Sequence, residues 1–163
     1  MITAICPGSF DPVTQGHMDI IRRASRLFDR VIVVAMTNGA KSPLFTQAER
    51  VELLNRAVNA DGLESVVVDC YDGLLADYVE MRQADVIVKG LRAMSDFEYE
   101  FQMALTNRKL NNRAETVFLT TTAEHMYLSS SLVKQVAGYG GDISDFVPAC
   151  ILPDILNKYR KDR

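Results

Sequence analysis

Residues 5–17 read Ile5-Cys6-Pro7-Gly8-Ser9-Phe10-Asp11-Pro12-Val13-Thr14-Gln15-Gly16-His17, and they set the class of fold. The apolar run from Ile2 to Ile5 predicts a strand, and the proline, glycine and aspartate residues after it interrupt regular structure. From about Gly16 a helix is predicted, because apolar side chains recur at helical spacing. They are Ile20, Ile21, Ala24, Leu27 and Phe28. The order strand, loop and helix is typical of an α/β fold, in which small ligands bind at the carboxyl ends of the strands.

Strands and helices are predicted to alternate along the rest of the chain. The near-continuous β-branched run of residues 30–36 is typical of a strand covered on both faces, as parallel sheets require. Further strands are predicted at 65–69, 85–88 and 116–120. Helices are predicted after the capping-box segment 46–49, at 73–83, from Asp96, at 129–137 and at 153–160. We therefore expect residues 1–163 to form one α/β domain, a Rossmann-like five-stranded parallel sheet with helices on both faces. A flavodoxin-like strand order stays open.

Composition and charge argue against several classes of protein. The 163 residues carry a net charge of -3, whereas a general nucleic-acid binder is usually basic. Three cysteines, Cys6, Cys70 and Cys150, are too few and too widely spaced for a disulfide framework or a zinc site. No apolar run reaches the roughly 18 residues of a membrane helix. We therefore expect a cytoplasmic protein with neither nucleic acid nor a membrane as partner.

Polar and charged side chains follow four of the predicted strands. They are Ser9 to His17, Lys41, Lys89 to Arg92, and His125 to Ser131. Because the carboxyl ends of parallel strands meet at one edge of a sheet, these groups are expected on the same rim. An arginine offers a planar fork to phosphate oxygens, and lysines act as mobile point charges. Three cations with a histidine on one rim indicate a polyphosphate site.

Two short motifs lie at predicted strand-to-helix junctions. Thr14-Gln15-Gly16-His17 resembles the Thr/His-x-Gly-His signature of the nucleotidyltransferase superfamily. Ser129-Ser130-Ser131 resembles the Ser-Ser-Ser/Thr signature that accompanies it. Serine is a good helix N-cap, yet three in a row exceed what capping needs, and helix N-termini attract phosphate.

The chain also resembles a single family within that superfamily, the bacterial phosphopantetheine adenylyltransferases. The resemblance rests on residues 7–12, the Lys41 loop, Gly90-Leu91-Arg92-Ala93, residues 96–100 and residues 129–134. It extends from about the first strand to the last helix. It implies transfer of the adenylyl group of ATP to 4′-phosphopantetheine, which gives dephospho-coenzyme A and pyrophosphate in the penultimate step of coenzyme A synthesis.

The resemblance also implies roles for individual residues. His17 would bond the α-phosphate and stabilise charge in the transition state, with Lys41 and Arg92 as further catalytic residues. The 4′-phosphopantetheine site would consist of Ser9, Lys41, Leu75 and Lys89. The ATP site would consist of Ser9, Phe10, His17, Gly90, Leu91, Arg92, Glu100, His125, Met126, Tyr127, Leu128, Ser129, Ser130 and Ser131.

Two positions depart from the family pattern. Lys89 stands where arginine is frequent, so the charge remains but the planar fork is lost. Gly138 stands where some members carry a basic residue, so an auxiliary phosphate contact is expected to be missing. Mg²⁺ is the expected cofactor because it accompanies ATP. No dedicated carboxylate cage is evident, so the substrate phosphates would hold the metal.

Other interpretations remain at this point. Another nucleotidyltransferase of the superfamily, acting on a different acceptor, would share both signatures, and a non-catalytic ATP sensor would need no His17. The resemblance implies a homohexamer. The apolar residues Phe97, Phe101, Met103 and Leu105 are expected in the core in the first place, and at a subunit contact in the second.

Overall fold

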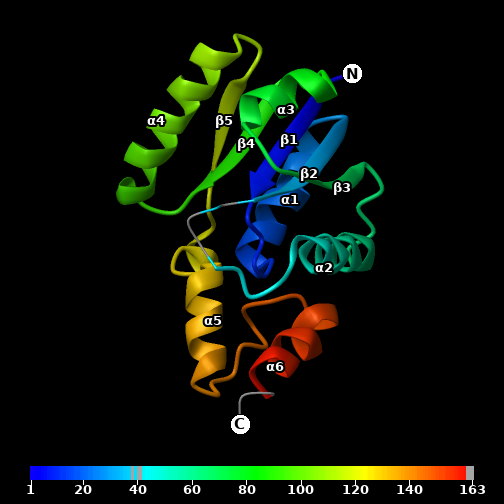
Figure 1. Cartoon of the computed structure of the whole chain (residues 1–163), viewed down its shortest axis with the longest axis vertical. Coiled ribbons are helices and arrows are strands. Elements are labelled where there is room, and N and C mark those ends of the chain that lie inside the picture. Colours follow the sequence, from blue (N-terminus) through cyan, green and yellow to red (C-terminus); the bar gives the residue numbers. More distant parts are fainter. Residues whose placement is uncertain (38, 40–41, 161–163) are drawn as a thin grey trace.

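The computed structural model describes residues 1–37, 39 and 42–160, and a parallel sheet runs through its centre (Figure 1). The strands are β1 (Thr3–Gly8), β2 (Arg30–Met36), β3 (Val66–Tyr71), β4 (Val86–Leu91) and β5 (Glu115–Thr120). They form one sheet in the order β3-β2-β1-β4-β5, and every pair is parallel. The position of β1 between β2 and β4 confirms the Rossmann-like prediction and excludes the flavodoxin-like order, in which β1 and β3 are neighbours.

Helices pack on both faces of this sheet, as predicted. α1 (Gln15–Leu27) and α2 (Gln47–Ala60) lie on one face, and α3 (Leu75–Arg82) and α4 (Met94–Leu110) lie on the other. α5 (Ser130–Gly138) and α6 (Leu152–Arg160) lie beyond the carboxyl ends of the strands (Figure 1). Alternate residues of β1 and β2 point to opposite faces. Val31 and Val33 belong to the core that α1, α2, α5 and α6 cover, whereas Ile32 and Val34 pack on the side of Tyr78 and Val79 in α3.

The strands β1 and β4 separate towards their carboxyl ends. They pair only at Ala4 with Val86 and at Ile5 with Ile87. The sequence predicted that Pro7 and Gly8 interrupt the strand, and this was wrong, because both pair with β2. A proline fits there because the ladder towards β4 has already ended. Residues 89–91 likewise extend β4 instead of following it. The gap between the two strand ends is the topological switch point of the sheet, where α/β proteins bind ligands.

The core prediction for the apolar residues of α4 was also wrong. Phe97, Phe101, Met103 and Leu105 are between 37% and 55% exposed. This helix lies over the β4–β5 end of the sheet and beside α3, so little of the fold covers its outer surface (Figure 1). Leu27, at the end of α1, is 62% exposed as well. Of the helices that the structure describes, none is long and apolar enough to span a membrane.

Candidate active site

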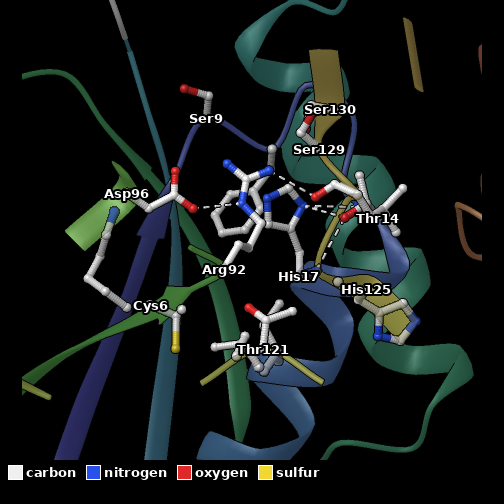
Figure 2. A pocket seen from close by; sticks show the side chains of 18 of the residues that line it. Cys6, Ser9, Thr14, His17, Arg92, Asp96, Thr121, His125, Ser129 and Ser130 are labelled. Carbon is white, nitrogen blue, oxygen red and sulfur yellow. Dashed lines mark hydrogen bonds and ion pairs between the residues drawn. The ribbon is translucent and has the colours of Figure 1, made fainter. Parts of the chain in front are cut away.

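A pocket of about 330 Å³ opens where β1 and β4 diverge (Figure 2). Its floor comes from the ends of these strands, including Cys6 and Gly90, and its rim from the first turns of α1, α4 and α5. The N-termini of α1 and α5 both border it, so their free N–H groups and dipoles favour an anion.

His17 is fixed by the cap of its own helix. Thr14 is the N-cap of α1, and its side chain accepts a hydrogen bond from the His17 N–H. The His17 ring completes the capping box, because Nδ1 accepts from the Thr14 N–H at 3.0 Å. A neutral imidazole whose Nδ1 accepts a backbone N–H carries its proton on Nε2. The ring therefore offers one N–H donor from its other edge, and its lining position makes that donor available to the pocket.

The electrostatic surroundings keep this imidazole neutral. Burial, together with the positive charges of Arg92 and Lys89, lowers the pKa of His17 from 6.5 to about 4. At neutral pH His17 therefore acts as a hydrogen-bond donor and not as a cation or a proton donor. Burial raises the pKa of Cys6 to about 12, so this thiol in the pocket floor is no nucleophile at neutral pH.

Phe10 supports the other side of the His17 ring. The two rings meet edge to face, with centroids 5.0 Å apart. Phe10 is 5% exposed and has a φ of 49°, a left-handed conformation that is uncommon outside glycine. Gly8 leaves the room for this ring, since a Cβ on Gly8 would lie 3.0 Å from the Phe10 Cζ.

The cations of the pocket are paired with carboxylates of α4. Arg92 Nε lies 3.1 Å from Asp96 Oδ2, and Arg92 Nη1 donates to the Leu128 carbonyl at 3.0 Å. Lys89 Nζ lies 3.4 Å from Glu100 Oε2. These partly exposed pairs are weak, so a phosphate can compete for the cations, while the carboxylates still limit where each cation points.

The serines at the start of α5 are partly engaged within the protein. Ser129 is the N-cap, and its Oγ accepts from the Leu132 N–H at 3.1 Å. Ser130 Oγ donates to the Pro12 carbonyl at 2.8 Å, which joins α5 to the β1–α1 loop. Both serines and Ser131 line the pocket. The expectation of an anion site here rests more on the helix N–H groups than on three free hydroxyls.

Most of the predicted site residues meet at this pocket. The lining residues among them are Ser9, Phe10, His17, Lys89, Gly90, Arg92, Glu100, His125, Leu128, Ser129, Ser130 and Ser131. His125 is half-buried there, with its Nδ1 3.0 Å from Thr122 Oγ1.

Other predicted residues lie elsewhere. Leu91, Met126 and Tyr127 do not line the pocket. Leu75 packs with Met36 and Tyr71 against the core on the α3 side. Lys41 lies outside the described residues.

Some lining residues were not predicted from the sequence. Asp96 could have been found, because it lies four residues before Glu100 and so shares a face of α4 with it. Thr121 and Cys6 carry no such signal. Gly138 lies at the far end of α5 from the pocket, beside Tyr159, where a Cβ would make an ordinary contact at 3.6 Å.

Comparison with known proteins identifies the family of this chain. The family model described as cytidylyltransferase-like matches residues 5–136. The phosphopantetheine adenylyltransferase of Alkaliphilus metalliredigens is 54% identical, and the match covers 97% of this chain and 99% of the relative. That of Caldanaerobacter subterraneus subsp. tengcongensis is 53% identical over 99% of both chains. The chain belongs to the phosphopantetheine adenylyltransferase family.

Solved structures of other nucleotidyltransferases share the fold of this chain. A putative nicotinate-nucleotide adenylyltransferase from Vibrio parahaemolyticus superposes with a TM-score of 0.68, at 20% identity over 97% of this chain and 96% of that one. The nicotinic acid mononucleotide adenylyltransferase of Plasmodium falciparum, complexed with NaAD, gives 0.67 at 15% identity over 98% and 95%. At these identities the likeness concerns the fold alone.

Proposed function

We propose that this protein transfers the adenylyl group of ATP to 4′-phosphopantetheine and releases pyrophosphate, as its family membership implies. The observation that carries the chemistry is the neutral His17 ring, whose tautomer is fixed by Thr14 inside a pocket with two cations and two helix N-termini. The product is dephospho-coenzyme A, and the reaction is the penultimate step of coenzyme A synthesis. We place the reaction in the cytoplasm.

The reaction needs no general base and no covalent intermediate. A phosphate oxygen of 4′-phosphopantetheine, already ionised at neutral pH, attacks the α-phosphorus of ATP. The new P–O bond forms as the bond from the α-phosphorus to the α,β-bridging oxygen breaks, and the electron pair leaves with pyrophosphate. Catalysis then consists of alignment and charge stabilisation.

Individual residues supply these two effects. His17 Nε2–H donates to a non-bridging oxygen of the α-phosphate, where negative charge builds up in the transition state. Arg92 and the N–H groups at the start of α5 hold the β- and γ-phosphates. Lys89 and Ser9 hold the phosphate of the acceptor, and Glu100 directs the Lys89 ammonium across the pocket.

The experiment that tests this function measures pyrophosphate release from ATP. The acceptors are 4′-phosphopantetheine, dephosphorylated pantetheine and nicotinamide mononucleotide, each at the same concentration. We expect release with 4′-phosphopantetheine alone. Release with nicotinamide mononucleotide would move the chain to another nucleotidyltransferase activity. Tight ATP binding without release from any acceptor would favour an ATP sensor.

Magnesium enters this proposal as part of the nucleotide substrate. Within the described residues no group of three or more histidine, cysteine, aspartate or glutamate side chains could hold a metal ion. Asp96 and Glu100, the acidic residues that line the pocket, are already paired with Arg92 and Lys89. The described part of the chain therefore does not fit a resident metal, and we derive no step through one. Excess chelator is expected to stop turnover, and added Mg²⁺ to restore it.

We also propose that the chain assembles into a homohexamer. The outer surface of α4 supports self-association, because Phe97 and Phe101 stack with centroids 5.5 Å apart while 37% and 47% exposed. Light scattering tests this proposal. We expect six copies for the wild type, and a smaller species for Phe101→Glu, with Arg108→Glu on the same helix as a charge control.

A further inference from the structure

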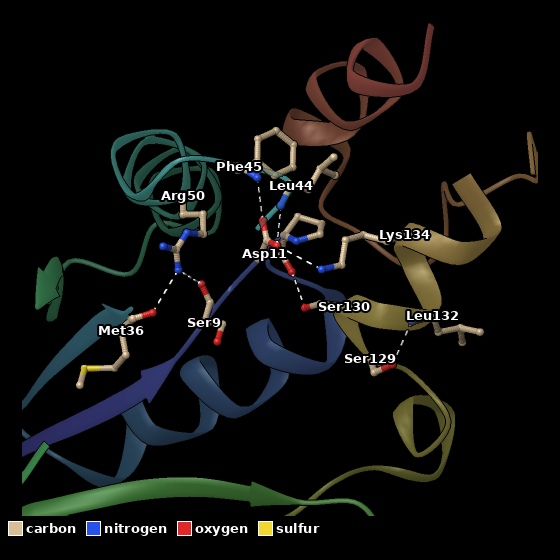
Figure 3. Close-up of polar contacts among 11 residues, drawn as sticks. Ser9, Asp11, Met36, Leu44, Phe45, Arg50, Ser129, Ser130, Leu132 and Lys134 are labelled. Carbon is tan, nitrogen blue, oxygen red and sulfur yellow. Dashed lines mark hydrogen bonds and ion pairs between the residues drawn. The ribbon is translucent and has the colours of Figure 1, made fainter. Parts of the chain in front are cut away.

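The turn between β1 and α1 carries pocket residues in a conformation that must be held from outside. Ser9 and Phe10 both line the pocket, and Phe10 is the residue with the left-handed backbone that packs on His17. Such a conformation persists in a non-glycine residue only where the surroundings determine it. The next residue, Asp11, is bonded to two segments that are distant in the chain (Figure 3).

Asp11 is a buried carboxylate with three donors. It is 5% exposed, its Oδ1 accepts from the Phe45 N–H at 2.9 Å, and its Oδ2 accepts from the Leu44 N–H at 2.9 Å and from Lys134 Nζ at 3.1 Å. A buried carboxylate is tolerated only when it is hydrogen-bonded in this way, and charged hydrogen bonds are strong and directional. The donors come from two segments that are 33 to 123 residues away in the chain.

The same turn is tied from its other side. Arg50, 4% exposed on α2, donates from Nη1 to the Ser9 carbonyl at 2.7 Å and to the Met36 carbonyl at 3.1 Å. In Figure 3 the side chains of Arg50 and Lys134 approach the turn from opposite sides. The Ser130 hydroxyl adds a bond to the Pro12 carbonyl. The turn is thereby fixed in position relative to both α2 and α5.

From this arrangement we propose that Asp11 is a positioning residue for adenylyl transfer. Its carboxylate holds the Phe10 turn against α5. The His17 donor and the α5 N-terminus can then contact the polyphosphate chain of the same ATP molecule. Asp11 does not line the pocket, so it would act through the residues that do. The inference rests on the proposed function, because alignment matters most in the transition state, where a small displacement of a catalytic group costs about 10²-fold in rate.

The test compares Asp11→Asn with two controls that lie away from the pocket. Asp154→Asn removes the carboxylate of the Arg56–Asp154 pair, which joins α2 to α6, and Ile155→Val weakens the buried core. For each variant kcat, both KM values, ATP affinity by calorimetry and the melting temperature are measured. We expect Asp11→Asn to lower kcat by about 10- to 100-fold with ATP affinity within about three-fold. Both controls should keep kcat within about two-fold.

Lys134→Met provides a second, milder variant that keeps both backbone donors of Asp11. We expect kcat to fall by about three- to ten-fold, and Asp11→Asn/Lys134→Met to be no slower than Asp11→Asn, because the two substitutions break one interaction. If Asp11→Asn is too unstable to assay, the kcat of Lys134→Met tests the positioning role instead.

A kcat within two-fold of wild type in Asp11→Asn, or in Lys134→Met where Asp11→Asn does not fold, would overturn the positioning role and leave Asp11 a stabilising residue only. If the wild type itself releases no pyrophosphate with 4′-phosphopantetheine, the proposed function fails. If the wild type is active and the variants match it, only the inference about Asp11 fails.

Discussion

The imidazole of His17 accepts a hydrogen bond from the backbone N–H of Thr14, with 3.0 Å between Thr14 N and His17 Nδ1. The bond does two things at once, since it satisfies a free N–H at the start of α1 and leaves the ring proton on Nε2. The side chain that caps the helix is therefore also the one that we propose as the catalytic donor. The Thr-x-Gly-His spacing has a direct physical reason, because residue N3 is the one whose side chain reaches back to the N-cap.

Substitution of His17 is expected to impair turnover much more than nucleotide binding. His17→Ala should lower kcat by about 10²-fold or more, the size of effect seen when a preorganised donor to developing charge is lost. ATP affinity should stay within a few-fold. Steady-state kinetics and calorimetry with ATP separate the two effects.

Two amide variants sharpen that prediction. A glutamine can place an N–H near the position of Nε2, whereas an asparagine reaches only about as far as Nδ1. His17→Gln should therefore retain about ten-fold more activity than His17→Asn, which should resemble alanine. Near-normal turnover in His17→Ala would refute the donor role.

The lowered pKa of His17 predicts how stability depends on pH. In the unfolded chain the imidazole takes up a proton near 6.5, whereas in the folded protein its pKa is about 4. As pH falls from 6.5 towards 4 the unfolded chain binds a proton that the folded protein does not, so the free energy of unfolding falls. The His17 pKa difference thus changes the free energy of unfolding by about 3 kcal/mol, and this stability is fully present only above pH 6.5.

Urea unfolding between pH 7 and pH 4.5 measures this dependence. Hydrogen bonds lower the pKa values of Glu49 and Asp69 from 4.5 and 3.8, so these carboxylates begin to lose their stabilising effect near the acid end of this range and lose most of it below pH 4.5. The wild type should lose stability across the measured range, and His17→Gln should lose less. Parallel curves for the two proteins would show that His17 titrates normally in the folded state.

A methyl group on Gly8 is expected to disturb the site through Phe10. The new Cβ would lie 3.0, 3.1 and 3.3 Å from three atoms of the Phe10 ring, which in turn packs on His17. Because Phe10 is buried, the ring can relieve this contact only by moving the turn or the imidazole. We expect Gly8→Ala to lower kcat by about ten-fold.

Two further variants identify the cause of the loss in Gly8→Ala. Added to Phe10→Leu, the same substitution should cost much less, since the smaller side chain leaves room. Gly138→Ala, whose Cβ meets Tyr159 at an ordinary 3.6 Å, should leave kcat unchanged. An equal loss in the Phe10→Leu background would mean that the ring contact is not responsible.

The sequence predicted the alternation of elements well because each element has a local cause. The β-branched run 30–36 is β2 to the residue, and the Thr46–Glu49 capping box starts α2 as predicted. The predicted strand ends were wrong for a reason that is not local. Pro7 can continue β1 only because β4 stops pairing at Ile5, and no sequence pattern reports where a neighbouring strand turns away.

The distinction between local and non-local causes also applies to the predicted site residues. Residues gathered at strand ends were predicted correctly, since parallel topology alone brings His17, Lys89 and Arg92 to one rim. The contacts of Arg50 and Asp11 were not predicted, because apart from the Lys134 ammonium their partners are backbone groups of distant segments, which any sequence supplies. Apolar spacing on α4 identified its apolar residues but could not show that the described residues leave them between 37% and 55% exposed.

Replacement of Lys89 tests its proposed role in holding the phosphate of the acceptor. Its ammonium lies 3.4 Å from Glu100 and supplies one point charge to the pocket. Lys89→Arg adds a planar fork that can donate to Glu100 and to a phosphate at once, so the KM for 4′-phosphopantetheine should fall by about three-fold. Lys89→Ala should raise that KM by about ten-fold or more.

Lys109 provides the control, because it is exposed in the last turn of α4 and lies outside the pocket. Lys109→Ala removes the same charge and should change neither KM. Initial rates at saturating ATP give these constants, and an unchanged KM in Lys89→Ala would show that another group holds the acceptor phosphate.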